Sequence, residues 1–129
     1  MRIFYSHAKR SYGTSAEAKQ LAIIRGRFPG DEVVDPSKDQ REFASEEEET
    51  RYYLGVIDGC DSVVFSRRGG VVTEGVLGEV NHALAGGKPV YEIRGGGRMV
   101  RHTKPFGRSS KADAVGYLLS ELLRRRREG

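Results

Sequence analysis

The chain has 129 residues, of which 37% are hydrophobic and 31% charged, so it is long enough for one hydrophobic core and short for two domains. Its only cysteine, Cys60, excludes an internal disulfide and a cysteine-based zinc cluster. No apolar run approaches the roughly 20 residues that cross a bilayer. We therefore expect a cytoplasmic protein with a single domain over 1–129, without membrane association.

The net charge of +4 comes from the C-terminal end, 124–129, because removing Arg124 to Arg127 leaves no net charge. Such a run either complements the dipole of a final helix or binds nucleic acid. No aromatic residues are interleaved for base stacking, so we expect a solvated helix end and not a nucleic-acid partner.

Strand and helix signals alternate in the first half of the chain. Residues 2–8 ("RIFYSHA") are typical of a first strand, and 31–37 ("DEVVDPS") of a short second strand closed by Asp35-Pro36. Between them lies a predicted helix that begins at Ser15 as N-cap. Its apolar residues recur at near-helical spacing: Ala16, Leu21, Ile24 and Phe28.

A second helix is well marked at both ends. Ser45 is the predicted N-cap, Glu48 its capping-box partner, and Gly59 the C-terminal stop. We interpret the acidic cluster Glu46–Glu49 as compensation of the helix dipole and not as a metal site. Either Tyr52 or Tyr53 faces the core.

The second half continues the alternation. Residues 61–66 ("DSVVFS") predict a fully buried third strand, and a helix from Thr73 or Glu74 to about Ala85 follows. Residues 88–93 ("KPVYEI") predict a fourth strand. A flexible link, 94–107, holds a short fifth strand around Arg98 to His102, and 109–128 predicts a last helix.

This order of elements predicts an α/β fold of the flavodoxin-like or Rossmann-like class. We expect three layers around a doubly wound, mostly parallel sheet of five strands in the order 2-1-3-4-5. Ligands of such sheets bind outside the carboxyl ends of the strands. The loops at that edge are 6–14, 66–73 and 94–98.

Two of these loops carry cations, hydroxyls and glycines. The candidate ligands of an anionic group are side chains and amides at Lys9, Arg10, Arg67, Arg68, Gly69 and Gly70. Glycine amides approach an anion closely because no Cβ intervenes. A phosphorylated ligand is one interpretation, and ordinary solvated arginines are the other. Neither a Walker loop nor a G-x-G-x-x-G fingerprint is present.

Glu79 lies in the second turn of the predicted third helix, beside Gly78 and one turn after Gly75. The inward face of this helix is already supplied by apolar residues such as Val80 and Ala83. Packing therefore does not require Glu79, and the glycines leave space beside its carboxylate. It is either a solvent-facing glutamate or a functional one.

The segment "GVLGEVNHALAGGKPVYEI", 75–93, resembles the nucleoside 2-deoxyribosyltransferase family, including its relatives that hydrolyse deoxynucleoside monophosphates. The similarity extends upstream to "IDGCDSVVFS", 57–66, and covers roughly residues 1–93. It implies that Glu79 is the nucleophile that attacks the anomeric carbon and forms a glycosyl-enzyme intermediate. Water or a second base then accepts the sugar.

The resemblance also implies a nucleoside or nucleotide ligand, no cofactor or metal, and a homodimer or higher homo-oligomer whose partner completes the site. One departure is the loop after the third strand, where the family's aspartate is missing and Ser66 is the only polar equivalent. In the first loop, Tyr5 and Ser6 are candidates for base or sugar contacts. His7 either protonates a departing purine or satisfies loop carbonyls.

Asp35 either approaches this site or only forms the Asp-Pro turn. The competing hypothesis is a non-catalytic nucleotide-binding or sensor module of the same fold, in which Glu79 contacts a ribose hydroxyl. A nucleic-acid-associated protein that uses the arginine tail is the third.

Overall fold

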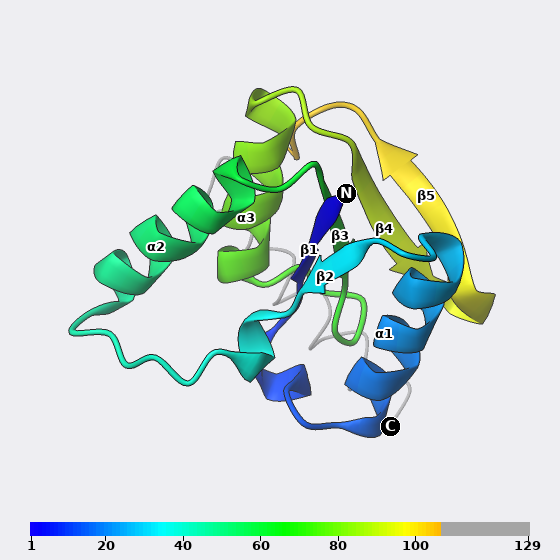
Figure 1. Cartoon of the computed structure of the whole chain (residues 1–129), viewed down its shortest axis with the longest axis horizontal. Helices are drawn as coiled ribbons and strands as arrows, with labels where there is room; N and C mark the ends of the chain where they lie inside the picture. Colours follow the sequence, from blue (N-terminus) through cyan, green and yellow to red (C-terminus); the bar gives the residue numbers. More distant parts are fainter. Residues whose placement is uncertain (107–129) are drawn as a thin grey trace, which may run out of the picture.

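The computed structural model describes residues 1–106. Its sheet has five strands in the order β2-β1-β3-β4-β5, as predicted (Figure 1). β1, β2, β3 and β4 are parallel neighbours, and β5 runs antiparallel to β4. The strands are β1 Arg2–Ser6, β2 Glu32–Val34, β3 Ser62–Ser66, β4 Val90–Arg94 and β5 Arg98–His102. The predicted flavodoxin-like α/β class is confirmed.

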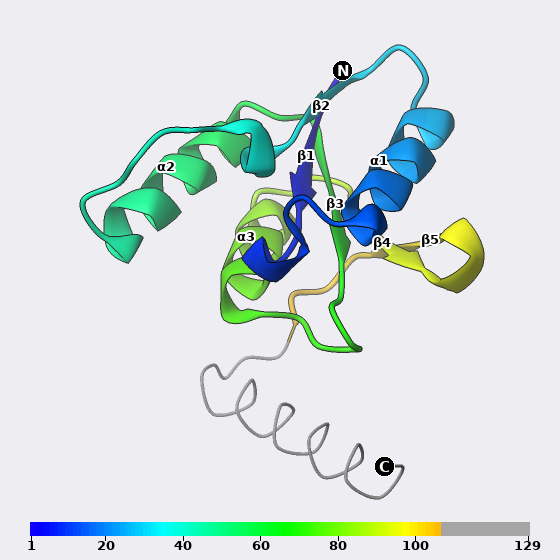
Figure 2. The same cartoon turned by 90° about the horizontal axis from the view of Figure 1, so that it is seen from below.

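The α-helices cover both faces of the sheet. They are α1 Ser15–Arg27, α2 Glu46–Asp58 and α3 Glu74–Ala85, with short 3-10 turns η1 Lys9–Ser11, η2 Pro36–Lys38 and η3 Gly95–Gly97. Figure 2 shows α2 and α3 on one side of the sheet and α1 on the other. The predicted last helix, 109–128, and the basic end, 124–129, lie outside the described residues.

Side chains of β1 alternate between two hydrophobic cores. Phe4 packs in the core under α2 and α3 with Phe65 and Val80, whereas Tyr5 packs in the core under α1 with Ile24. The period of two in a strand causes this division. It sends Ser6, the last residue of β1, toward α3, whereas His7, the next residue, faces α1.

The start of α1 differs from the prediction. Thr14, not Ser15, is the N-cap, and its hydroxyl accepts a hydrogen bond from the Glu17 amide at 3.2 Å. Ala16 is exposed and Glu17 is 3% exposed. In this first turn the side chain that faces inward is Glu17, and it contacts the polar ring of His7. The apolar side chains by which α1 packs in the core begin one turn later, at Leu21.

The ends of α2 agree with the prediction. The Ser45 hydroxyl accepts from the Glu48 amide at 3.1 Å, and Gly59 is the C-cap. The Glu48 carboxylate accepts from the Ala44 amide at 3.2 Å, one residue before the usual capping-box partner.

The link between β4 and β5 is a tight turn and not the flexible segment that we predicted. Gly96 and Gly97 have φ angles of 75° and 77°, which favour glycine. They join β4 and β5 into an antiparallel hairpin, so the prediction of a short fifth strand is confirmed. In the part of the chain that the structure describes, no helix has the length and hydropathy of a membrane span.

Candidate functional site

The carboxylate of Glu79 meets the end of β1 from α3. The Ser6 hydroxyl donates a hydrogen bond to Glu79 Oε1 at 2.8 Å, and Ser6 itself is 0% exposed. A Cβ placed on Gly75 or Gly78 would meet no atom within 4 Å. Both glycines are exposed, and the space that we expected them to leave beside the Glu79 carboxylate stays a prediction.

The surroundings of Glu79 disfavour its charged form. Burial raises its pKa to about 7, against the opposing effect of the Ser6 hydrogen bond. The carboxylate of Glu49 adds to the increase and the ammonium of Lys9 reduces it. Lys9 and Glu49 form an ion pair with each other. In residues 1–106, no cation lies within ion-pair distance of Glu79.

Two tyrosines lie near Glu79 that the sequence did not assign to the site. Burial, and next the Glu79 charge, hold the pKa of Tyr12 above its usual range. Burial raises the pKa of Tyr53 to about 12, with a smaller contribution from the same charge. Both phenols therefore keep their protons at neutral pH. Tyr12 lies within loop 6–14, which the sheet topology had already selected, whereas Tyr53 also packs against Phe4, as a core residue does.

Tyr5 and Ser66 lie on the other face of the sheet from Glu79. Both hydroxyls donate to Oε1 of Gln20, a residue of α1, and the Ser66 bond is 2.8 Å long. Tyr5 is 0% exposed, and burial keeps the pKa of its phenol above the ordinary value. The structure therefore brings Ser6, but not Tyr5 or Ser66, to Glu79.

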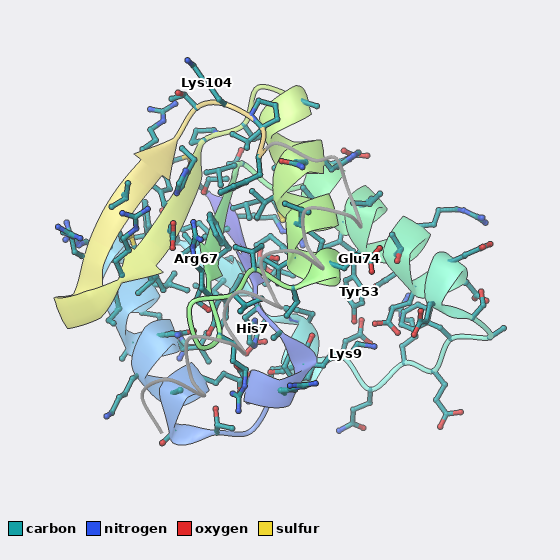
Figure 3. The ribbon with its side chains drawn as sticks, turned by 180° about the vertical axis from the view of Figure 1, so that it is seen from behind. His7, Lys9, Tyr53, Arg67, Glu74 and Lys104 are labelled. Carbon is teal, nitrogen blue, oxygen red and sulfur yellow. The ribbon has the colours of Figure 1, made fainter. Side chains whose placement is uncertain are left out.

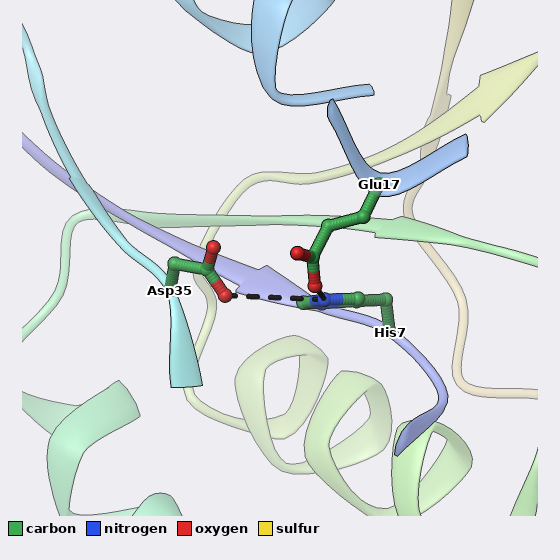
Figure 4. Close-up of side chains that lie close together, drawn as sticks. All are labelled: His7, Glu17 and Asp35. Carbon is green, nitrogen blue, oxygen red and sulfur yellow. Dashed lines mark hydrogen bonds and ion pairs between the residues drawn. The ribbon is translucent and has the colours of Figure 1, made fainter. Parts of the chain in front are cut away.

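His7 turns away from Glu79 and toward α1. Its Nε2 lies 2.7 Å from Glu17 Oε2 and 3.9 Å from Asp35 Oδ1 (Figure 4). Asp35 also forms the predicted turn, because its Oδ1 accepts from the Ser37 amide at 2.9 Å. Sequence reasoning missed Glu17, since an acid in a first helical turn is ordinarily explained by the helix dipole.

Most of the predicted loop cations have protein partners. Arg67 pairs with Glu92 at 2.7 Å, and Arg68 donates to the Ser11 hydroxyl at 3.1 Å. Arg10 is exposed. Figure 3 shows His7 and Lys9 in the half of the molecule away from Lys104, with Arg67 and Tyr53 nearer the middle. A phosphate bound by Lys9 or Arg67 would have to share the cation with a carboxylate.

The glycines after β3 form a tight turn. Gly69 and Gly70 have φ angles of 58° and 80°, and the turn closes through hydrogen bonds between Arg68 and Val71. Positive φ is the conformational reason for glycine at these two positions.

Glu92 is a buried acid that the sequence analysis did not single out. It is 2% exposed, yet three side chains contact its carboxylate: Arg67 at 2.7 Å, His102 at 2.8 Å and Arg94 at 3.2 Å. Burial opposes the charge, but the hydrogen bond from Arg67 and those from the other partners hold the pKa of Glu92 below its usual range. It joins the loop after β3 to the β4–β5 hairpin.

The raised pKa of Glu79 predicts a pH-dependent cost to stability. The folded protein binds more protons than the unfolded chain between the unfolded pKa of 4.5 and the folded pKa of about 7, so the free energy of unfolding falls as pH rises through this window. We expect Glu79→Gln to remove this fall and to be more stable than the parent at pH 8 by on the order of 2 kcal/mol, after discounting for solvent screening.

Urea unfolding of both proteins at pH 5 and pH 8 measures the difference. Glu74→Gln, a change at an exposed glutamate of the same helix, is the control and keeps the parent's pH dependence. Equal pH slopes for the parent and Glu79→Gln would contradict the raised pKa.

Comparison with known proteins adds the fold alone. No family model matches the chain, and no curated protein matches it. A solved structure described as a conserved protein from Enterococcus faecalis V583 is similar, with a TM-score of 0.57 and 18% sequence identity. The match covers 74% of this chain and 68% of that one.

Proposed function

We propose that the protein cleaves the N-glycosidic bond of nucleosides or nucleoside 5′-monophosphates, by hydrolysis or by deoxyribosyl transfer, with Glu79 as nucleophile. One observation carries the proposal: a shielded glutamate at the carboxyl edge of the parallel strands, oriented by Ser6. Acids that only stabilise a fold pair with cations, as Glu92 does. Glu79 instead has no cation within ion-pair distance in residues 1–106 and accepts a hydrogen bond from Ser6, which suits a carboxylate that serves a ligand.

The proposed reaction forms one bond and breaks one bond in each step. Ser6 occupies Oε1, so we assign the attack on the anomeric carbon to Oε2. The bond from this carbon to the base nitrogen breaks, and the base leaves with its electron pair and takes up a proton. Water, or the nitrogen of a second base, then attacks the same carbon, displaces the Glu79 carboxylate and releases a proton to solvent.

Tyr12 and Tyr53 suit the binding of a nucleoside. Their phenols stay protonated, so each offers a donor to a sugar or base acceptor as well as an aromatic surface. His7, predicted as the proton donor, faces Glu17 instead. In this proposal the leaving base takes its proton from water.

Incubation with a panel of deoxynucleosides and their 5′-monophosphates tests the activity, with free base detected by chromatography. We expect base release from at least one member of the panel, accelerated over a protein-free control. Ligand binding without base release would instead favour the nucleotide-binding or sensor module.

The pH dependence of base release provides a separate prediction. The nucleophile is the carboxylate form, so kcat/KM should fall as pH drops through the Glu79 pKa of about 7. Because the Ser6 hydrogen bond lowers this pKa, we expect Ser6→Ala to move the acidic limb to higher pH. Ser62→Ala is the matched control. Ser62 is the first residue of β3, at the end of the strand away from the carboxyl edge, so this change should leave the acidic limb in place. An unmoved limb in Ser6→Ala would count against the assignment of the limb to Glu79.

A further inference from the structure

The cluster of His7, Glu17 and Asp35 brings together three side chains that are typical metal ligands. One ligand atom from each lies within 4.8 Å of the other two. The three side chains are only 0%, 4% and 5% exposed. They come from the end of β1, the first turn of α1 and the turn after β2 (Figure 4), so the cluster joins three elements at the carboxyl edge of the sheet.

The hydrogen bonds behind these side chains match those that support bound metals. His7 Nδ1 lies 3.2 Å from the Tyr5 carbonyl oxygen, which can only accept, so Nδ1 carries a proton and Nε2 faces the carboxylates. Glu17 Oε1 accepts from the Gly13 amide at 3.1 Å, and Asp35 Oδ1 from the Ser37 amide at 2.9 Å. Metal-bound histidines and carboxylates are ordinarily held in this way.

Apart from the imidazole of His7, no positively charged side chain of residues 1–106 lies within ion-pair distance of this cluster. Two carboxylates share one imidazole, and in the described range 1–106 neither carboxylate pairs with a lysine or arginine. One buried oxygen of this cluster, Asp35 Oδ2, has no hydrogen-bond partner in the described residues. An unpartnered buried oxygen costs stability, and a cation bound between the carboxylates would give it a partner.

We propose that His7, Glu17 and Asp35 bind a divalent transition-metal ion, with Zn²⁺ as the first ion to test. One imidazole nitrogen and two carboxylate oxygens form a donor set that Zn²⁺ accepts in tetrahedral geometry. Ligand atoms about 2 Å from such an ion lie about 3.3 Å apart. Nε2 and the Glu17 oxygen must then separate slightly from 2.7 Å, and the Asp35 oxygen must approach from 3.9 Å. The Ser37 hydroxyl or water completes the coordination.

The role of this ion would be to hold the end of β1 in place. His7 directly follows Ser6, the residue that orients Glu79, and the ring of Tyr12 packs on His7 with 4.9 Å between centroids. An ion that fixes His7 therefore also fixes two neighbours of Glu79. Its binding stabilises the folded chain whether or not the protein cleaves nucleosides.

The test is a titration of the full, tag-free, metal-stripped chain with Zn²⁺, followed by calorimetry and thermal unfolding. We expect one equivalent to bind and Tm to rise by about 5 °C or more at a hundredfold excess over Kd. Co²⁺ in place of Zn²⁺ should give the visible absorption of a tetrahedral ion. No binding of Zn²⁺ by the parent chain would overturn the proposal.

Matched variants locate the site. Asp35→Asn and Glu17→Gln each keep the shape of the side chain and remove one anionic ligand, so each should weaken Zn²⁺ binding at least tenfold while the circular dichroism spectrum is retained. Asp58→Asn breaks the His82–Asp58 pair at the surface and should bind Zn²⁺ like the parent. Parent-like affinity in both Asp35→Asn and Glu17→Gln, or an equal loss in Asp58→Asn, would overturn the assignment to this cluster.

Discussion

Replacing Glu79 with alanine is expected to lower the rate of base release by roughly a thousandfold or more, because the variant lacks the atom that attacks the sugar. The fold should survive the change. Glu79 is held by one hydrogen bond from Ser6, and its burial in charged form is a cost to the native state above pH 7. Chromatography of free base, with circular dichroism on the same samples, measures both quantities.

Glu74→Ala is the matched control for this experiment. Glu74 begins the same helix and is exposed, so its removal alters the helix dipole interaction by only a few tenths of a kcal/mol and should leave base release unchanged. If Glu79→Ala releases base as fast as the parent, Glu79 is not the nucleophile and the proposed mechanism is wrong.

Glu92→Ala is expected to lower the free energy of unfolding by about 3 kcal/mol or more at pH 7, because it leaves two arginines without their buried anion. Arg67 and Arg94 would then repel one another, and the His102 ring, which lies beside Phe65 and Phe106, would lose its contact with the carboxylate. Urea unfolding gives the difference directly.

The lowered pKa of Glu92 also predicts how the stability difference between the parent and Glu92→Ala depends on pH. A lowered folded pKa stabilises the protein above the unfolded value, and that stabilisation disappears as pH falls through the folded pKa. The gap between parent and Glu92→Ala should therefore narrow in acid. Glu32→Ala, which removes one partner of the exposed pair with Arg2, should change stability by less than about 1 kcal/mol. Equal effects of the two substitutions would contradict the role assigned to Glu92.

The fold followed from local patterns in the sequence. The alternation of strand and helix signals, the buried run at β3 and the Ser45 cap each depend on residues close together in the chain. The order β2-β1-β3-β4-β5 followed from the fold class that this alternation predicts. The position of Glu79 in the second turn of α3 followed from the same periodicity. The errors were local too: Thr14 caps α1 in place of Ser15, and Gly95–Gly97 forms a turn and not a flexible link.

The contacts of the candidate site were not predictable in this way. Ser6 and Glu79 are 73 residues apart in the chain, and His7 and Asp35 meet only because β1 and β2 are neighbours. The sequence placed Tyr5, Ser6 and His7 in one loop region, the first two as candidate contacts to base or sugar and His7 as a candidate proton donor. The pleat of β1 separated them, with Ser6 on the Glu79 face and its two neighbours on the α1 face.

By itself, the sequence determined an α/β sheet with polar loops at its carboxyl edge and a glutamate that packing does not need. Only the tertiary structure decided which of those polar groups meet. Strand and helix periods depend on neighbours in the chain, whereas the partner of a side chain depends on which face it takes when the layers pack. Because neighbouring residues at the end of β1 face opposite sides of the sheet, Ser6 contacts Glu79 on one face. His7 contacts Glu17 and lies near Asp35 on the other face.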